Sequence, residues 1–224
     1  MLEERTVELA GLRAIDIGPR DAALAVLVLH GREMCADDLA PFAHALGVSA
    51  RFVFPDGPLP GRVRGRSWWP IDSEARARAL RDGPLELANT WPAGREAARA
   101  LLGRLRAAIA PPAARVAVIG FSQGGMLAMD YALHTDAQPA ALALLSSSRI
   151  AFADWEPRLS ALRHLPMLVA HGRADAELAF SAGEGLRDAA LAGGGQVTWL
   201  EFDGAHEIPL VVWRGVRRLL RPLA

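Results

Sequence analysis

Residues 120–124, with the sequence GFSQG, place one serine hydroxyl between two glycines in the spacing G-x-S-x-G. An apolar run typical of a buried strand precedes this segment, and a sequence typical of a helix follows it. A sharp turn from strand to helix strains the serine backbone, and glycines two residues before and after it permit close approach of the chain. This context favours a nucleophile over a glycine turn that carries an incidental serine. We therefore predict that Ser122 is the nucleophile and that the backbone N–H of Gln123 faces an oxyanion.

A serine hydroxyl is a poor nucleophile unless a base and an acid activate it. After a nucleophile of this type the acid and then the histidine follow in chain order, each at the carboxyl end of a later strand. Asp175 comes just past a predicted strand that ends near His171, and His206 comes just past the next strand. We therefore expect a catalytic triad of Ser122, Asp175 and His206 that transfers an acyl group in two steps.

Other residues could take these roles, but their positions suit them less. Asp203 and Glu201 also lie near His206, yet Glu201 falls within a predicted strand and Asp203 is too close in sequence to reach behind the imidazole easily. We expect His171 to be a packed or capping residue. Cys35 has no glycine turn around it and is expected to be a small residue packed near the site. Three further histidines fall on or beside predicted helices and are expected to be exposed: His44, His134 and His164.

Two loops are expected to complete the site. Residues 29–34 (LHGREM) follow the first buried strand, where a second oxyanion donor is expected, and the backbone N–H of Arg32 is the candidate. The loop 55–72 is rich in Pro and Gly and holds Trp68 and Trp69, the candidate substrate-binding residues. Neighbouring side chains of an extended backbone point opposite ways, so we expect one tryptophan to pack on the protein and Trp68 to wall an acyl pocket. The alternative is that both cover the sheet edge.

The predicted strands and helices alternate along the chain. Residues 5–11 and 12–18 are typical of an antiparallel pair of strands. The later pattern predicts a mostly parallel central sheet with helices on both faces, and with no repeat or linker it predicts one domain over residues 1–224. Further strands are expected at 22–31, 50–57, 114–120, 140–148, 165–175 and 196–202, and helices at 36–47, 92–110, 123–134, 180–195 and 208–220.

Composition excludes several classes of function. The chain has 25 basic and 25 acidic residues, and the arginines form no stripe, so nucleic acid is not an expected partner. A single cysteine excludes an internal disulfide, no H-E-x-x-H spacing implies a metal site, and no G-x-G-x-x-G segment supports a dinucleotide site. No apolar run reaches the roughly 20 residues that span a bilayer. With an acidic, polar N-terminal segment, these features predict a cytoplasmic protein without stable membrane insertion.

Five segments together resemble the phospholipase/carboxylesterase family of α/β-hydrolases, whose eukaryotic members include the acyl-protein thioesterases. The similarity runs over about residues 24–220 and is carried by LHGRE, RSWWPID, GFSQGGMLAMDYAL, HGRAD and GAHEIP. The resemblance implies an α/β-hydrolase fold and a serine carboxylesterase acting on small or medium acyl esters, sometimes thioesters or lysophospholipids, without a cofactor. It implies the same triad, with the N–H groups of Arg32 and Gln123 as oxyanion donors, and it places the tryptophan loop beside the cleft.

The chain departs from the family pattern at two places. Arg32, Glu33 and Met34 stand where glycine or small polar residues are common, and an acid there opposes a developing negative charge unless it points away. After Asp175 the chain has AELAF in place of a Val-Pro pair. The rival hypotheses are thioesterase or lysophospholipase activity in the same pocket, a peptidase or acyltransferase, and a non-catalytic protein that binds a ligand there. An apolar patch on the closing helix would also suit a homodimer.

Overall fold

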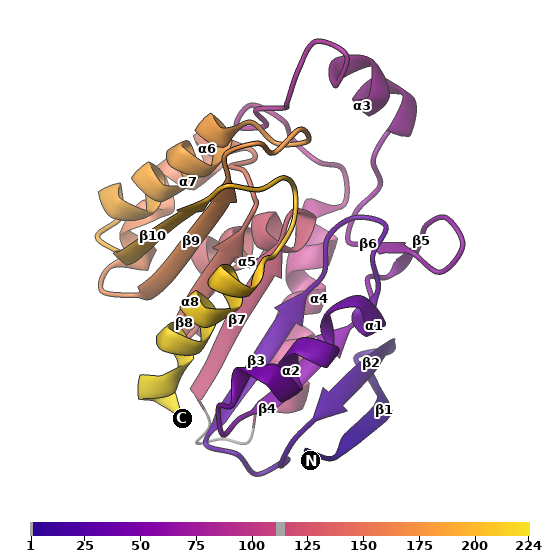
Figure 1. The fold of residues 1–224 in the computed structure, drawn as a ribbon, viewed down its shortest axis with the longest axis vertical. Coiled ribbons are helices and arrows are strands. Elements are labelled where there is room, and N and C mark those ends of the chain that lie inside the picture. The colour runs from indigo at the N-terminus through magenta and orange to yellow at the C-terminus, as the bar shows by residue number, and fades with distance from the viewer. Residues whose placement is uncertain (1, 111–114) are drawn as a thin grey trace.

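A computed structural model describes residues 2–110 and 115–224, and its centre is an eight-stranded sheet in the order β1-β2-β4-β3-β7-β8-β9-β10 (Figure 1). The first two strands pair antiparallel with each other, and β2 pairs antiparallel with β4; all later pairings are parallel. The predicted mixed sheet is therefore confirmed. The strands are β1 (Glu4–Leu9), β2 (Leu12–Ile17), β3 (Leu24–Leu29), β4 (Arg51–Pro55), β7 (Arg115–Phe121), β8 (Ala141–Leu145), β9 (Pro166–Gly172) and β10 (Gln196–Phe202).

Helices cover both faces of this sheet, as the alternation of elements predicts. On one face the core joins the sheet to α1 (Ala36–Leu39), α2 (Pro41–Leu46) and α8 (Leu210–Leu220). On the other face it joins the sheet to α4 (Arg95–Ile109), α5 (Gln123–His134) and α7 (Phe180–Ala192). Every residue of the central strand β3 is buried, which explains its continuous apolar sequence.

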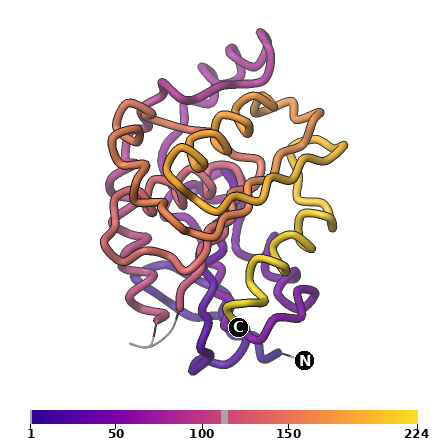
Figure 2. Tube along the Cα trace, turned by 90° about the vertical axis from the view of Figure 1, so that its left-hand side faces the viewer, coloured from indigo at the N-terminus to yellow at the C-terminus, as the bar shows by residue number. Residues whose placement is uncertain are grey.

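The region above the carboxyl ends of the parallel strands contains an element that the sequence does not predict. Helix α3 (Ser73–Ala79) has no buried residue and begins at Asp72, whose carboxylate accepts hydrogen bonds from two backbone N–H groups. Both views show α3 projecting from the body at the end opposite the C-terminus (Figures 1 and 2). Its lack of an apolar face explains why hydrophobic periodicity misses it.

Several boundaries differ from expectation. The helix predicted at 36–47 is two short helices, α1 and α2, because Pro41 begins a new helix after Ala40. The loop 55–72 holds a small hairpin of β5 (Leu59–Pro60) and β6 (Arg66–Ser67). Residue 114, the first of one predicted strand, lies outside the described residues. The remaining elements are α6 (Phe152–Trp155) and two 3₁₀ helices, η1 (Glu156–Leu162) and η2 (Arg221–Leu223).

The helices in the described part of the chain are either too short or too polar to cross a bilayer.

Candidate active site

Ser122 occupies a strained turn between β7 and α5. Its backbone has φ 52° and ψ −117°, a conformation that is rare for a residue with a side chain. A Cβ atom on Gly120 would come within 2.2 Å of the Gly124 carbonyl oxygen, and one on Gly124 within 2.3 Å of the Leu29 carbonyl oxygen. The turn therefore requires glycine at both positions, for the steric reason that the sequence pattern suggests.

The structure brings Ser122, His206 and Asp175 into one chain of hydrogen bonds. The Ser122 hydroxyl oxygen lies 2.9 Å from His206 Nε2, and His206 Nδ1 lies 2.7 Å from Asp175 Oδ2. The aspartate is buried, whereas the histidine and serine are partly exposed. In this arrangement Nδ1–H donates to the carboxylate, which leaves Nε2 free to accept the serine proton.

Local bonds hold the Asp175 carboxylate in its charged form. Oδ1 accepts hydrogen bonds from the backbone N–H groups of Glu177 (2.8 Å) and Leu178 (2.9 Å). Burial by itself raises the pKa of Asp175, but the bonds from His206 and from these N–H groups outweigh it, so the pKa lies below its usual value. An ionised carboxylate is the form that can orient a histidine.

His171 is a packed residue that touches this acid. It is fully buried, and its Nε2 lies 3.1 Å from the Leu178 carbonyl oxygen and 3.4 Å from Asp175 Oδ2. Burial lowers the pKa of His171, so the ring is neutral. A neutral ring whose Nε2–H donates to the Leu178 carbonyl oxygen supports the turn that carries Asp175.

The alternative residues lie elsewhere. The Asp203 side chain is 99 % exposed and faces Arg173, which also pairs with Glu201 on β10. Cys35 is buried at the start of α1, as expected of a packed residue, and it lines a cavity other than the one that Ser122 lines. The expectation that His134 is exposed is wrong, because its side chain is only 10 % exposed.

Both candidate oxyanion donors line the same cleft as Ser122. The cleft has a volume of about 810 Å³, and Arg32 and Gln123 belong to its wall. Within residues 2–110 and 115–224, neither of their backbone N–H groups donates to a protein acceptor. Both N–H groups are thus free for a ligand, as an oxyanion hole requires.

The Glu33 carboxylate is held by the neighbouring loop. It accepts a hydrogen bond of 2.6 Å from the backbone N–H of Arg62, and a Cβ atom on Gly61 or Gly65 would come within 3 Å of it. Residue 33 itself has φ 61°, a left-handed conformation that is uncommon for a residue with a side chain. The acid next to the candidate oxyanion site is therefore engaged by the 61–65 loop.

His30 fixes the shape of the Arg32 loop. Its Nδ1–H donates to the Gly31 carbonyl oxygen (2.7 Å), and its Nε2 accepts from the Gly57 N–H (2.8 Å). This pair of bonds requires a neutral ring, and burial lowers the pKa of His30 accordingly.

The tryptophan pair corrects one expectation. Trp68 and Trp69 are both buried, each 2 % exposed, and of the two only Trp69 is among the described residues that line the cleft. Trp68 Nε1–H donates to the His30 carbonyl oxygen, and its backbone N–H donates to Gln123 Oε1. Gln123 Nε2–H in turn donates to the Trp69 carbonyl oxygen. The expectation that Trp68 walls the acyl pocket is therefore wrong, because distant parts of the fold bury it, and Trp69 lines the cleft in its place.

The sequence pattern misses most of the apolar cleft wall. Much of that wall comes from residues 85–92, a segment without regular periodicity, and from the first turn of α5. Trp91 is the only signal there, since an aromatic residue in an irregular segment often lines a site; its side chain is 60 % exposed. The apolar lining residues include Leu85, Leu87, Trp91, Met126, Ile150 and Leu178.

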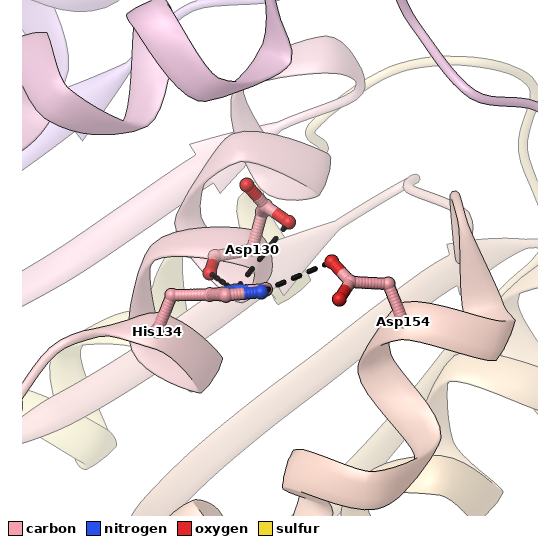
Figure 3. A group of neighbouring side chains, drawn as sticks. All are labelled: Asp130, His134 and Asp154. Atoms are coloured by element: carbon pink, nitrogen blue, oxygen red, sulfur yellow. Dashed lines mark hydrogen bonds and ion pairs between the residues drawn. The ribbon is translucent and has the colours of Figure 1, made fainter.

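A second group of polar side chains could reach a metal ion. Atoms of Asp130, His134 and Asp154 lie within 4.8 Å of one another (Figure 3). Arg95 donates to both carboxylates, and Arg99 donates to the second oxygen of Asp130. With its carboxylates taken by guanidinium groups, the cluster fits an ion-pair network that joins α4, α5 and α6 better than it fits a cation site.

Known proteins provide comparisons for this fold. The sequence model of the phospholipase/carboxylesterase family matches residues 91–221, more than half of the chain. No curated protein matches the sequence. Among solved structures, esterase PE8 is 21 % identical with a TM-score of 0.73, and the match covers 100 % of this chain and 99 % of that one. Acyl-protein thioesterase 2 of Zea mays is 17 % identical with a TM-score of 0.75, covering 94 % and 98 %. A carboxylesterase from Mesorhizobium loti is 18 % identical with a TM-score of 0.73, covering 97 % and 98 %. These likenesses confirm the α/β-hydrolase fold.

Proposed function

Because the chain belongs to the phospholipase/carboxylesterase family, we propose that it is a serine esterase in which Ser122, His206 and Asp175 cleave small or medium acyl esters. The observation that carries the proposal is the continuous hydrogen-bond chain from the serine hydroxyl through the imidazole to a buried, ionised carboxylate. A non-catalytic binding protein would have no need for this geometry. No cofactor takes part in the proposed reaction.

In the first step the Ser122 oxygen attacks the ester carbonyl carbon while His206 Nε2 accepts the hydroxyl proton. Asp175 holds the imidazole in the required tautomer and stabilises its positive charge. The N–H groups of Arg32 and Gln123 donate to the carbonyl oxygen as it becomes negative, and the N-terminus of α5 adds a favourable dipole. The imidazolium then protonates the leaving alcohol, which gives an acyl-enzyme.

In the second step His206 accepts a proton from water, and the resulting nucleophile attacks the acyl-enzyme. The tetrahedral species collapses when Ser122 regains its proton, which releases the acid. A thioester can follow the same route, because attack on the carbonyl and expulsion of a thiol use the same groups. The apolar wall of Leu87, Met126 and Ile150 suits an acyl chain in this cleft.

A fluorophosphonate probe and an ester series test the proposal. The native protein is expected to be labelled at Ser122, and heat-denatured protein is not. Ser122→Ala is expected to abolish labelling and to lower ester turnover by about three or more powers of ten, with its melting temperature close to that of the unsubstituted protein. Substitution of Ser147, whose hydroxyl donates to the Ser122 carbonyl oxygen, by Ala is the matched control and should keep labelling. Activity that survives in Ser122→Ala would refute the assignment.

A further inference from the structure

A second cavity, of about 430 Å³, adjoins the cleft beneath helix α3. It shares three lining residues with the cleft, Arg32, Glu33 and Arg76, so the two spaces lie side by side. We call it the basic cavity, because its charged lining consists of three arginines and one glutamate. Its lining residues are Arg32, Glu33, Arg62, Ser73, Arg76, Ala77 and Leu80.

The positive charge of the basic cavity is not balanced by its own residues. The Glu33 carboxylate already accepts the backbone N–H of Arg62 and lies 4.0 Å from the Arg32 guanidinium. In the described part of the chain, the Arg62 side chain has no ion pair and the Arg32 guanidinium makes no hydrogen bond. Arg76 pairs with Glu177, which faces the cleft. At least two guanidinium groups therefore keep donors available for an incoming anion.

Among the described residues, Arg32 is the clearest case of a charge in the basic cavity without a hydrogen-bonded counter-ion. Its side chain is only 24 % exposed, yet the nearest carboxylate is beyond hydrogen-bond distance. Burial and then the nearby Arg76 lower the pKa of Arg32 by more than Glu177 and Glu33 raise it. An anion in the basic cavity would supply the missing counter-charge, and a planar guanidinium can hold a carboxylate or a phosphate through two parallel hydrogen bonds.

Three acidic residues of the cleft each have bonding partners of their own. Asp72 accepts two backbone N–H groups at the start of α3, Glu177 pairs with Arg76, and Glu86 lies beside Arg149 and Ser148. These contacts occupy the carboxylates without removing their charge, and Glu177 also lies 4.0 Å from His206 Nε2. Within the described residues, the guanidinium donors that stay free in this region belong to Arg32 and Arg62.

We propose that the basic cavity binds a second, anionic group of the substrate, so that the preferred esters carry a carboxylate or a phosphate. The inference rests on the proposed esterase function and names its substrate class. Arg32 has two roles in it: its backbone N–H faces the reacting carbonyl, and its side chain, with Arg62 and Arg76, binds the anion. The neighbouring cavity is thereby a specificity site for the reaction at Ser122.

Two matched pairs of esters test this inference. Monoethyl succinate and ethyl butyrate differ by a carboxylate in place of a methyl group, and butyrylglycerol phosphate and butyrylglycerol differ by a phosphate. The readout is the ratio of kcat/KM for the anionic ester to that for its neutral partner, so a general loss of activity cancels. The unsubstituted protein is expected to show a ratio of at least about ten in one pair, as for a charge-assisted hydrogen bond worth about 1.5 kcal/mol. The pair that shows it identifies the anion.

Two variants and one control locate the effect. Arg62→Gln is expected to lower the ratio about threefold, the scale of an exposed ion pair, and Arg32→Gln about tenfold. Arg64→Gln removes the same charge two residues along the same loop. Arg64 pairs with Asp38 and lines a different cavity, so the ratio should not change. Thermal melting of each variant shows that the fold is kept.

The outcomes separate the two proposals. Ratios near one in both pairs, or an equal fall in the Arg62 and Arg64 variants, would overturn the basic cavity as a specificity site while Ser122-dependent hydrolysis of the neutral esters upholds the esterase. No Ser122-dependent hydrolysis of any of the four esters would overturn both.

Discussion

The Gln123 side chain is expected to hold the tryptophan segment against the nucleophile turn, and its removal should be costly. Gln123 is 2 % exposed, accepts the Trp68 N–H at 2.9 Å, and donates to the Trp69 carbonyl oxygen at 3.1 Å. Leucine has a similar volume but can make neither bond. Gln123→Leu would therefore leave one buried N–H and one buried carbonyl group without partners.

The expected loss follows from these two groups. Each buried polar group left unpaired costs about 1–3 kcal/mol, and the added apolar contact of leucine offsets part of this. We expect Gln123→Leu to lower the free energy of unfolding by about 2–4 kcal/mol. For a chain of this length that corresponds to a fall of roughly 5–15 °C in Tm. Because Trp69 lines the cleft, kcat/KM for esters should fall as well, although the Gln123 backbone N–H remains.

Urea unfolding and thermal melting measure this effect, with Gln138→Leu as the matched control. Gln138 Nε2 also lies within hydrogen-bond distance of two backbone carbonyl oxygens, but the residue is exposed, so water replaces its bonds. The control is expected to cost less than about 0.5 kcal/mol. A Gln123→Leu variant as stable as the control would refute the reasoning that the side chain clamps the loop.

Three further predictions follow from buried groups. The lowered pKa of His30 means that unfolding takes up a proton below about pH 6.5, so the free energy of unfolding should fall as pH drops from 6.5 to 5.5, by up to about 1.4 kcal/mol per unit. This slope, measured from urea midpoints, should be smaller in His30→Gln, and an equal slope in that variant would contradict the assignment. Trp69→Ala should change the preference among acyl chain lengths, whereas Trp68→Ala should lower Tm and leave that profile unchanged; the opposite pattern would contradict the cleft assignment. Asp130→Ala should destabilise by about 3–5 kcal/mol, because Arg99 and the Trp155 indole N–H lose the carboxylate they bond to and Arg95 loses one of its two. A chelator should leave the Tm of the unsubstituted protein unchanged.

The sequence by itself determines the parts of this protein that depend on local backbone geometry. At the Ser122 turn, glycine is required at 120 because the clashing carbonyl belongs to Gly124 in the same turn, so five residues are enough to reveal this requirement. Glycine is required at 124 for a tertiary reason, since the clashing carbonyl there belongs to Leu29 on the adjoining strand β3. The alternation of apolar strands with helices likewise predicts the sheet and its covered faces. The chain order of the serine, the acid and the histidine predicts which side chains can meet at the carboxyl ends of the strands.

Only the tertiary structure decides what surrounds these residues. Trp68 is buried by contacts that no local pattern can predict, since its hydrogen-bond partners His30 and Gln123 lie 38 and 55 residues away along the chain. Long-range contacts also decide the environment of His134, which lies beside Asp154 of α6. In the sequence Arg32 and Arg62 are scattered charges, and the fold brings them to one cavity. Periodicity reports which face a residue occupies on its own element, whereas burial and charge balance depend on which distant elements pack against that face.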